Sequence, residues 1–175
     1  VSLEHEVSII TGLQALRHAD PEKYIPVPIY VDKAGKWWTG DVVGTQEFYR
    51  AGHNADAAAH ATPFSLALGG QNDIDVALLC FHGGAGENGS VQGALELTGI
   101  PYQGPGVAAS AVCFDKIFTR QILHSEGIAQ PAFLWFSPSE YDEDPSHILT
   151  RIESEIQFPC FIKAANSGSS IGVQR

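Results

Sequence analysis

The first hydrophobic pattern along the chain is helical. Ile9, Leu13 and Leu16 recur at intervals of three or four residues, which places their side chains on one face of a helix. Residues 2–19 are therefore predicted to form a loop that enters a helix. We expect this helix to end at Asp20-Pro21, because proline cannot continue it.

A strand-like pattern follows the helix. Residues 25–31 mix prolines with β-forming residues, and such a segment is extended rather than helical. The turn-forming residues 32–36 lead into Trp37-Trp38, so a hairpin is predicted, with the tryptophans as a buried or edge pair rather than a ligand-stacking site. Residues 44–73 are rich in alanine, histidine, glycine and asparagine without clear periodicity. They are predicted to form a variable surface excursion.

The middle of the chain contains a continuous apolar run over residues 75–81. Its length and composition predict a strand buried on both faces of a parallel sheet. A glycine-rich loop, a short helix from about Val91 to Thr98 and a strand over residues 100–102 are predicted next. Strand, loop, helix and strand form a βαβ unit. Its loop leaves the carboxyl end of the first strand, which is where open α/β sheets bind ligands.

Gly104-Pro105-Gly106 interrupts the chain, and we place a domain boundary there, between residues 1–105 and 106–175. The second part is predicted to contain, in order, a helix over residues 107–126 with Gly127 as its C-cap, a strand over 132–136, a polar helix over 139–156, a strand over 158–163, a small-residue loop over 164–170 and a strand over 171–175. This alternation of strands and helices makes the predicted fold class α/β.

The composition is that of a globular protein, with 44% hydrophobic and 17% charged residues in a chain of 175. Ten basic and 20 acidic residues give a formal net charge of −10. This charge repels a phosphate backbone and argues against nucleic acid as a partner, whereas a small anionic ligand senses only its local pocket. No apolar run reaches the about 20 residues that span a bilayer, and no signal peptide is visible. We therefore predict no membrane association and a cytoplasmic location.

The cysteines and the ends of the chain add two expectations. Cys80, Cys113 and Cys160 are widely spaced among apolar neighbours, which favours buried reduced thiols over disulfides or a zinc site. The chain contains no methionine and ends at Arg175 inside a predicted strand. We therefore expect it to be part of a longer enzyme.

The residues most suited to chemistry are those of the segment over 82–93, His-Gly-Gly-Ala-Gly-Glu-Asn-Gly-Ser-Val-Gln-Gly. Five glycines in twelve residues permit positive φ and let backbone N–H groups approach a ligand. His82 directly follows the predicted strand and is placed to donate to a carboxylate or a phosphate. The same composition also fits a structural turn that His82 merely caps.

Four segments in order resemble the D-alanine–D-alanine ligase family, and together they cover nearly the whole chain. Residues 82–93 match the family signature HGxxGE[DN]GxxQG at every defined position. Residues 2–8, Ser-Leu-Glu-His-Glu-Val-Ser, resemble its first loop. Residues 100–116 resemble its IPYxGxGVxxSAxxxDK segment, and residues 163–173 its KPxxxGSSxGV loop.

The resemblance implies an ATP-dependent ligase that makes D-alanyl-D-alanine for peptidoglycan precursor synthesis. ATP phosphorylates the carboxylate of one D-alanine, and the amine of a second attacks the acyl phosphate. It also implies a Rossmann-like N-terminal domain over residues 1–105, the first part of an ATP-grasp domain over 106–175, and a homodimer. The cofactors implied are ATP and Mg²⁺, with the metal ligands expected beyond Arg175.

The resemblance implies catalytic roles for Glu4, His82 and Ser169. Glu4 would hold the ammonium of the first D-alanine through a charge-assisted hydrogen bond, within a substrate-binding set that also includes Ser8 and His82. His82 would stabilise the transferring phosphoryl group, and Ser169 would orient Glu4. From the residues alone, Glu4 also fits a solvated acid at a helix start.

The implied ATP-binding residues lie in the second half of the chain. Lys116 and Lys163 would hold the phosphates as compact point charges, although a helical lysine such as Lys116 also fits a merely solvated side chain. Gly168, Ser169 and Ser170 would form a mobile loop that covers the phosphates with backbone N–H groups. The alternative for these three residues is an ordinary hairpin turn.

Departures from the family pattern keep other functions open. Phe114 replaces the usual methionine and Ala164 the usual proline, whereas Asn88 is tolerated. These changes indicate a distant member whose second substrate is D-alanine, D-serine or D-lactate, or a non-catalytic or truncated binding homologue.

A dinucleotide-binding oxidoreductase is disfavoured, since GGAGENG is not GxGxxG. His53 and His60 lie seven residues apart, which is not a zinc spacing.

Overall fold

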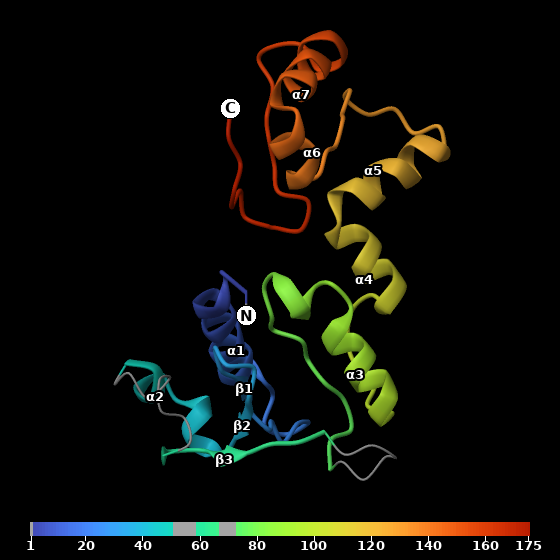
Figure 1. Ribbon diagram of the computed structural model, residues 1–175. Coiled ribbons are helices and arrows are strands. Elements are labelled where there is room, and N and C mark those ends of the chain that lie inside the picture. Colours follow the sequence, from blue (N-terminus) through green and yellow to red (C-terminus); the bar gives the residue numbers. More distant parts are fainter. Residues whose placement is uncertain (1, 51–58, 67–72) are drawn as a thin grey trace. The chain divides into compact units, whose positions relative to one another are not determined.

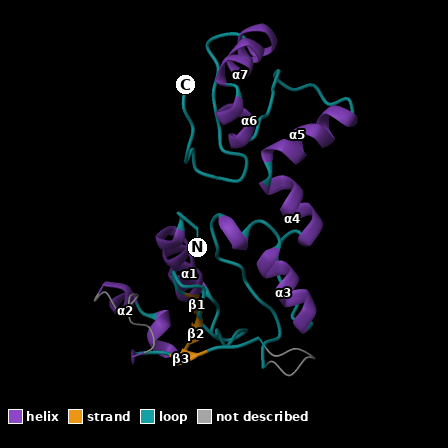
Figure 2. Ribbon diagram, viewed as in Figure 1, coloured by secondary structure: helices purple, strands orange, loops and turns teal. Residues whose placement is uncertain are grey.

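The computed structural model describes residues 2–50, 59–66 and 73–175, and the chain divides into two compact units, residues 1–111 and 112–175 (Figure 1). The division falls within helix α4 (Val107–Phe114). The architecture is a mixture of helices and one small sheet. Among the described residues, Figure 2 shows strands only in the first unit.

The first unit begins with the predicted helix, α1 (His5–His18). Glu4 occupies its N-cap position, and Arg17 and His18 in the last turn oppose the negative end of the helix dipole. The helix ends at Ala19, whose extended backbone leads into Asp20-Pro21. The predicted helix and its end before Asp20-Pro21 are both confirmed.

The predicted hairpin is also confirmed. Strand β1 (Ile29–Val31) pairs antiparallel with β2 (Trp37–Thr39), and Tyr30 faces Trp38. A short third strand, β3 (Thr62–Pro63), pairs antiparallel with β2, so the sheet order is β1-β2-β3. The Asp32 carboxylate closes the turn, because it accepts hydrogen bonds from the backbone N–H groups of Ala34 and Lys36 at 2.8 and 2.9 Å.

The core beside this sheet is built from Tyr30, Trp38, Val43 and Phe48, with Ile9 of α1 packed against it. Val43 comes from a 3₁₀ turn over Asp41–Gly44. Phe48 lies on α2 (Gln46–Arg50) and is only 1% exposed. The predicted surface excursion over residues 44–73 is therefore wrong for this part, because an aromatic side chain anchors it in the core. Residues 51–58 and 67–72 of that segment, His53 included, lie outside the described residues.

The apolar run over residues 75–81 is extended, but it is not the strand predicted. Among the described residues, its ladder pairing is one parallel bridge between Ala77 and Tyr102, with hydrogen bonds of 2.8 Å from Ala77 N to Pro101 O and 3.2 Å from Gln103 N to Ala77 O. Residues 100–102 were also predicted to form a strand, and in the structure they pair only through Tyr102 in this bridge.

Burial along the run alternates with the backbone pleat. Ala77, Leu79 and Phe81 pack against a second core cluster, whereas Val76 and Leu78 are 54% and 64% exposed. The buried residues of this cluster are Val91, Leu95 and Ile100. Burial on both faces is thus wrong, since the described residues cover one face of the segment and leave Val76 and Leu78 exposed. The covering elements are the predicted helix, observed as α3 (Ser90–Thr98), and Ile100.

The predicted helix over residues 107–126 is two helices, α4 and α5 (Lys116–Ser125). Asp115 adopts an extended backbone between them, and its carboxylate caps α5 by accepting from Ile117 N at 2.8 Å and Phe118 N at 3.0 Å. The C-cap of α5 is Glu126, and the predicted cap Gly127 follows it at φ +68°.

The predicted polar helix over residues 139–156 is also interrupted. It consists of α6 (Pro138–Glu143), α7 (Pro145–Arg151) and a π-helical segment over Ile152–Ile156. The break falls at Asp144-Pro145, since proline has no backbone N–H to donate and Asp144 instead caps α7. Ser137 and Glu140 form a reciprocal capping box at the start of α6.

The strands predicted for the second unit are wrong. Residues 132–136 form no strand. Residues 158–163 and 171–175 meet only through an antiparallel bridge, with 2.9 Å hydrogen bonds in both directions between Ile162 and Gln174. In the described part of the chain, these segments have no neighbouring strands to extend the pairing, so the bridge stays isolated.

Candidate active site

The glycine-rich loop in the first unit passes close to the start of α1. Gly83 has φ +66°, a conformation that strongly favours glycine. A Cβ at this position would also overlap the Glu4 carboxylate and the Ser2 hydroxyl. The backbone conformation favours glycine here, and the absence of a side chain lets the Glu4 carboxylate lie against the loop.

His82 is held by two hydroxyl groups of α1. Its backbone N–H donates to Ser8 Oγ at 2.9 Å, and its Nε2 lies 2.8 Å from Thr11 Oγ1. The Ser8 hydroxyl itself donates to the Glu4 carbonyl oxygen at 3.2 Å. The ring of His82 is thus tied to a helix 71 residues away in the sequence, which is more than the cap of a local turn would need.

The first unit therefore brings together three of the predicted site residues, Glu4, Ser8 and His82. All three are partly buried. Glu4 is further tied by its backbone N–H, which donates to Ser2 Oγ at 2.9 Å. An acid, a hydroxyl and an imidazole at the edge of a glycine-rich loop can bind a ligand that carries both a positive and a negative group.

Two further residues of this site, Thr11 and Gln92, were not predicted from the sequence. Thr11 contacts the His82 ring, and its signal was its place three residues after Ser8 on the same helix face. Gln92 on α3 donates from Nε2 to the Gly86 carbonyl oxygen at 3.0 Å and is only 4% exposed. Gln92 belongs to the matched signature, but the sequence pattern did not predict that its side chain binds the glycine-rich loop.

Lys116 in the second unit is bound to the small-residue loop. Its Nζ donates to the carbonyl oxygens of Ala165 at 3.3 Å and Ser167 at 2.5 Å, and its backbone N–H donates to Ala165 O at 3.1 Å. The Asp115 cap fixes the helix start that directs Lys116 to this loop. The alternative of a merely solvated lysine is therefore wrong.

Lys163 and the loop over residues 168–170 follow along the chain. Lys163 is exposed, and its Nζ lies 6.0 Å from the centroid of the Phe161 ring. Ser169 and Ser170 adopt left-handed backbone conformations, with φ of +48° and +61°. Ile171 N donates to Gly168 O at 2.9 Å, which closes a tight turn. Glu4 belongs to the first unit and Ser169 to the second, so their predicted pairing stays a prediction.

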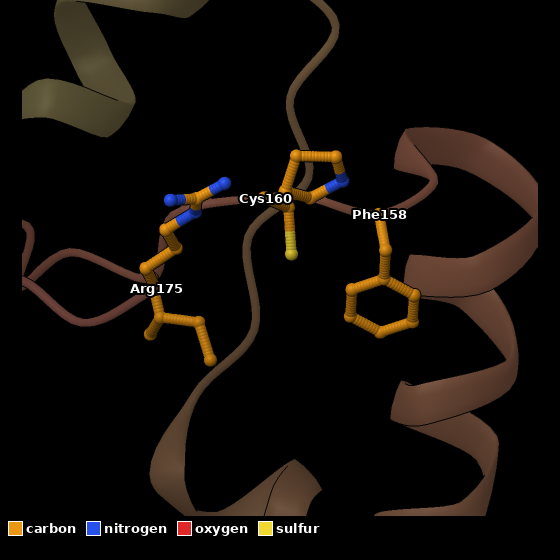
Figure 3. Close-up of a pocket in the computed structure, with 5 residues that line it drawn as sticks. Phe158, Cys160 and Arg175 are labelled. Atoms are coloured by element: carbon orange, nitrogen blue, oxygen red, sulfur yellow. The ribbon is translucent and has the colours of Figure 1, made fainter.

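A separate hollow of about 500 Å³ lies in the second unit. Figure 3 shows Phe158 and Arg175 on either side of Cys160 at this hollow, and Pro159 and Ile162 complete its lining. Its walls are mostly apolar, and they include none of the residues predicted to bind or react.

The described part of the chain also contains potential metal ligands and three free cysteines. No group of three or more histidine, cysteine, aspartate or glutamate residues lies close enough there to hold a metal ion. The three cysteines are free thiols, and Cys113 is exposed, contrary to the prediction of burial. Burial raises the pKa of the Cys80 thiol.

Comparison with known proteins agrees with the resemblance seen in the sequence. Residues 1–105 match the family described as D-ala D-ala ligase N-terminus, and residues 122–175 match D-ala D-ala ligase C-terminus. The chain therefore belongs to the D-alanine–D-alanine ligase family. Within the described ranges, no helix is long and apolar enough to cross a membrane.

Individual relatives show the same relationship over the whole chain. The chain is 40% identical to the D-alanine–D-alanine ligase of Caldicellulosiruptor bescii, over 100% of this chain and 50% of that protein. The enzyme of that name from Geobacillus kaustophilus is 35% identical, over 99% of this chain and 50% of that protein. The chain thus spans about half the length of the curated relatives it matches.

Solved structures resemble the chain at similar coverage. The D-alanine-D-alanine ligase from Coxiella burnetii aligns with a TM-score of 0.74 and 30% identity, over 99% of this chain and 51% of that one. The VanG D-Ala:D-Ser ligase from Enterococcus faecalis aligns with a TM-score of 0.79 and 26% identity, over 98% and 51%.

Proposed function

We propose that this protein is an ATP-dependent ligase that joins two D-alanines into D-alanyl-D-alanine through an acyl phosphate, for peptidoglycan precursor synthesis. The observation that carries this proposal is the cluster in the first unit, where the Glu4 carboxylate lies against Gly83 and Ser8 and Thr11 hold His82. It occurs in a chain whose curated relatives are named D-alanine–D-alanine ligases.

The cluster has groups suited to an amino acid whose carboxylate is being phosphorylated. The Glu4 carboxylate offers a charge-assisted hydrogen bond to the substrate ammonium. The His82 ring can donate to an oxygen of the transferring phosphoryl group, where negative charge accumulates. Ser8 keeps its hydroxyl on the His82 backbone and so positions the loop within the substrate-binding set.

The second unit supplies groups suited to the ATP phosphates. Two of the three ammonium N–H groups of Lys116 are used on the carbonyls of Ala165 and Ser167, which leaves one donor for a phosphate oxygen. Lys163 adds a second positive charge. Gly168, Ser169 and Ser170 would cover the phosphates with backbone N–H groups, and Ser169 would orient Glu4.

The finer architecture is part of the same proposal. Residues 1–105 would form a Rossmann-like N-terminal domain, and residues 106–175 the first part of an ATP-grasp domain. The parallel bridge between Ala77 and Tyr102, with α3 between its two segments, supports the first assignment. A solved Bacillus anthracis ligase complexed with ATP, 28% identical with a TM-score of 0.52, supports the use of ATP.

The remaining expectations concern the metal and the setting of the enzyme. The ligands of Mg²⁺ are proposed to lie outside residues 1–175, as the family resemblance implies. We also propose a homodimer in the cytoplasm, as the family resemblance implies. D-Serine is a second candidate for the attacking amine, since one of the similar structures is a D-Ala:D-Ser ligase.

The test is phosphate release by the full-length protein with ATP and Mg²⁺. Release should require D-alanine, and D-alanyl-D-alanine should appear in equal amount. Release that requires D-serine in addition to D-alanine, with the mixed dipeptide as product, would instead establish the second candidate. Release unaffected by either amino acid would refute both.

Variants test the assigned roles within the same assay. His82→Asn and Lys116→Met are expected to lower the rate by about 100-fold, the size of effect seen when a donor to developing charge is removed. The matched controls are His18→Asn on α1 and Lys36→Met in the hairpin, which lie away from the cluster and should keep the wild-type rate. Full activity of the first pair would remove these residues from the mechanism.

A further inference from the structure

One face of α1 holds both the backbone and the ring of His82. Ser8 and Thr11 lie three residues apart, so their side chains project from the same side of the helix. Ser8 Oγ accepts the His82 backbone N–H at 2.9 Å, and Thr11 Oγ1 lies 2.8 Å from Nε2 of the ring. The position of the ring is therefore set by a helix rather than by the loop that carries it.

The two hydroxyls use their protons differently. A serine or threonine within a helix commonly donates to the carbonyl oxygen four residues earlier. Ser8 does so, because its Oγ donates to Glu4 O at 3.2 Å. Among the described hydrogen bonds, the Thr11 hydroxyl meets only His82 Nε2. The Thr11 proton is thus available for the ring nitrogen.

The direction of this hydrogen bond decides what the ring offers to a ligand. A neutral imidazole has one nitrogen that donates and one that accepts. If Thr11 donates to Nε2, the proton of the ring must be on Nδ1. Nδ1–H is then a donor for an anionic oxygen, whereas the opposite tautomer would turn a lone pair toward the same oxygen.

We propose that Thr11 is a positioning residue that holds neutral His82 as its Nδ1–H tautomer, with Nδ1–H as the donor to a carboxylate or phosphoryl oxygen. The identity of that ligand rests on the proposed function, but the tautomer does not. The hydroxyl makes the required donor available without protonation of the ring.

The experiment is ¹⁵N NMR of the histidine rings in the full-length protein without ATP or D-alanine. It is recorded about two pH units above the ordinary histidine pKa of about 6.5, where a ring is neutral. The ring ¹⁵N shifts and their couplings to the carbon-bound ring protons distinguish a protonated nitrogen from a bare one. The signal lost in His82→Asn identifies His82 among the histidine signals of the protein.

The expected result is a protonated Nδ1 and a bare Nε2 in the wild type. Thr11→Ser keeps the hydroxyl and should keep this tautomer. Thr11→Val has nearly the same shape without the hydroxyl, and should shift His82 toward the Nε2–H form while the other histidine signals stay in place. A wild-type ring protonated on Nε2, or a Thr11→Val ring unchanged from wild type, overturns the proposal.

The outcomes separate this inference from the proposed function. Because the tautomer is read without substrates, it can be found as expected in a protein that releases no phosphate, which would refute only the ligase activity. An active ligase with the opposite tautomer would refute only the role of Thr11. If Thr11→Val does not fold, Thr11→Ala removes the same hydroxyl and takes its place, and a wild-type ring protonated on Nε2 still overturns the proposal.

Discussion

The side-chain amide of Gln92 donates a hydrogen bond to the carbonyl oxygen of Gly86 across 3.0 Å. Gln92 is only 4% exposed and stands on α3, whereas Gly86 belongs to the loop that begins at His82. The loop is therefore held by α3, which follows it in the sequence, and also by α1, which precedes it.

Replacement of Gln92 by Met should destabilise the protein by about 1–2 kcal/mol. It leaves the buried Gly86 carbonyl without its donor while the side-chain volume is nearly kept. Gln103→Met is the matched control, since Gln103 also donates to a carbonyl oxygen, that of Leu79 at 3.0 Å, but is exposed. Urea unfolding measures both variants. Equal losses would show that burial does not strengthen the Gln92 contact.

Gly89→Ala should cost more stability than Gly99→Ala, although both glycines flank α3 in left-handed conformations, with φ of +92° and +72°. A left-handed alanine costs about 1–2 kcal/mol at either position. At Gly89 the new Cβ would also lie 2.8 Å from the Val107 carbonyl oxygen, whereas at Gly99 it would meet open space. Thermal unfolding of the two variants checks this difference, and equal melting temperatures would exclude the clash.

The hairpin should lose stability in acid through Asp32. Burial raises the pKa of Asp32, but hydrogen bonds from the Trp38 indole and from the N–H groups of Lys36 and Ala34 outweigh it, so the pKa lies below the ordinary 3.8. The folded-state pKa is depressed, so the stabilisation is complete above 3.8 and is lost as the pH falls through the lower folded value.

Urea unfolding followed by tryptophan fluorescence can test this pH dependence. The stability difference between wild type and Asp32→Asn should be largest near pH 7 and shrink as the pH falls to about 2. Asp142→Asn, at an exposed position on α6, is the control and should retain the wild-type pH dependence. A constant difference between wild type and Asp32→Asn at all pH values would contradict the linkage.

Asp115→Ala should loosen the start of α5. The Asp115 carboxylate accepts from Ile117 N and Phe118 N, and loss of such a cap costs about 1 kcal/mol. Hydrogen exchange of these two amides should quicken by about fivefold, which is that energy converted to a ratio. Asp115→Asn retains a capping oxygen and should exchange nearly as the wild type. Unchanged exchange in Asp115→Ala would show that the cap does not hold this turn.

The elements that could be predicted from the sequence are those set by local patterns. The periodicity of Ile9, Leu13 and Leu16 indicated α1, and the turn at Asp32 indicated the hairpin. The run over residues 75–81 was misjudged, because strand formation depends on partners that no local pattern reveals. The breaks at Asp115 and Pro145 carried ordinary signals, a capping residue and a proline, but the surrounding helical pattern outweighed them.

The candidate site likewise contains residues that could be predicted from the sequence and residues that could not. The glycine-rich loop marked His82 as a candidate from the residues themselves, and the family resemblance added Glu4 and Ser8. Thr11 and Gln92 could not be predicted, because their roles depend on which side chain of one element faces another. For Lys116, the sequence could not distinguish a solvated side chain from one bound to the loop near Ser167.

The bonds between α1 and His82 also bear on the order of folding. They close a loop of more than 70 residues, since Thr11 and Ser8 stand 71 and 74 positions from His82. Contacts of such long sequence separation carry a large entropic cost before they form, whereas the turn at Asp32 closes within a few residues. The hairpin and α1 should therefore be in place early in refolding, and the histidine should reach its hydroxyl partners only in the last steps.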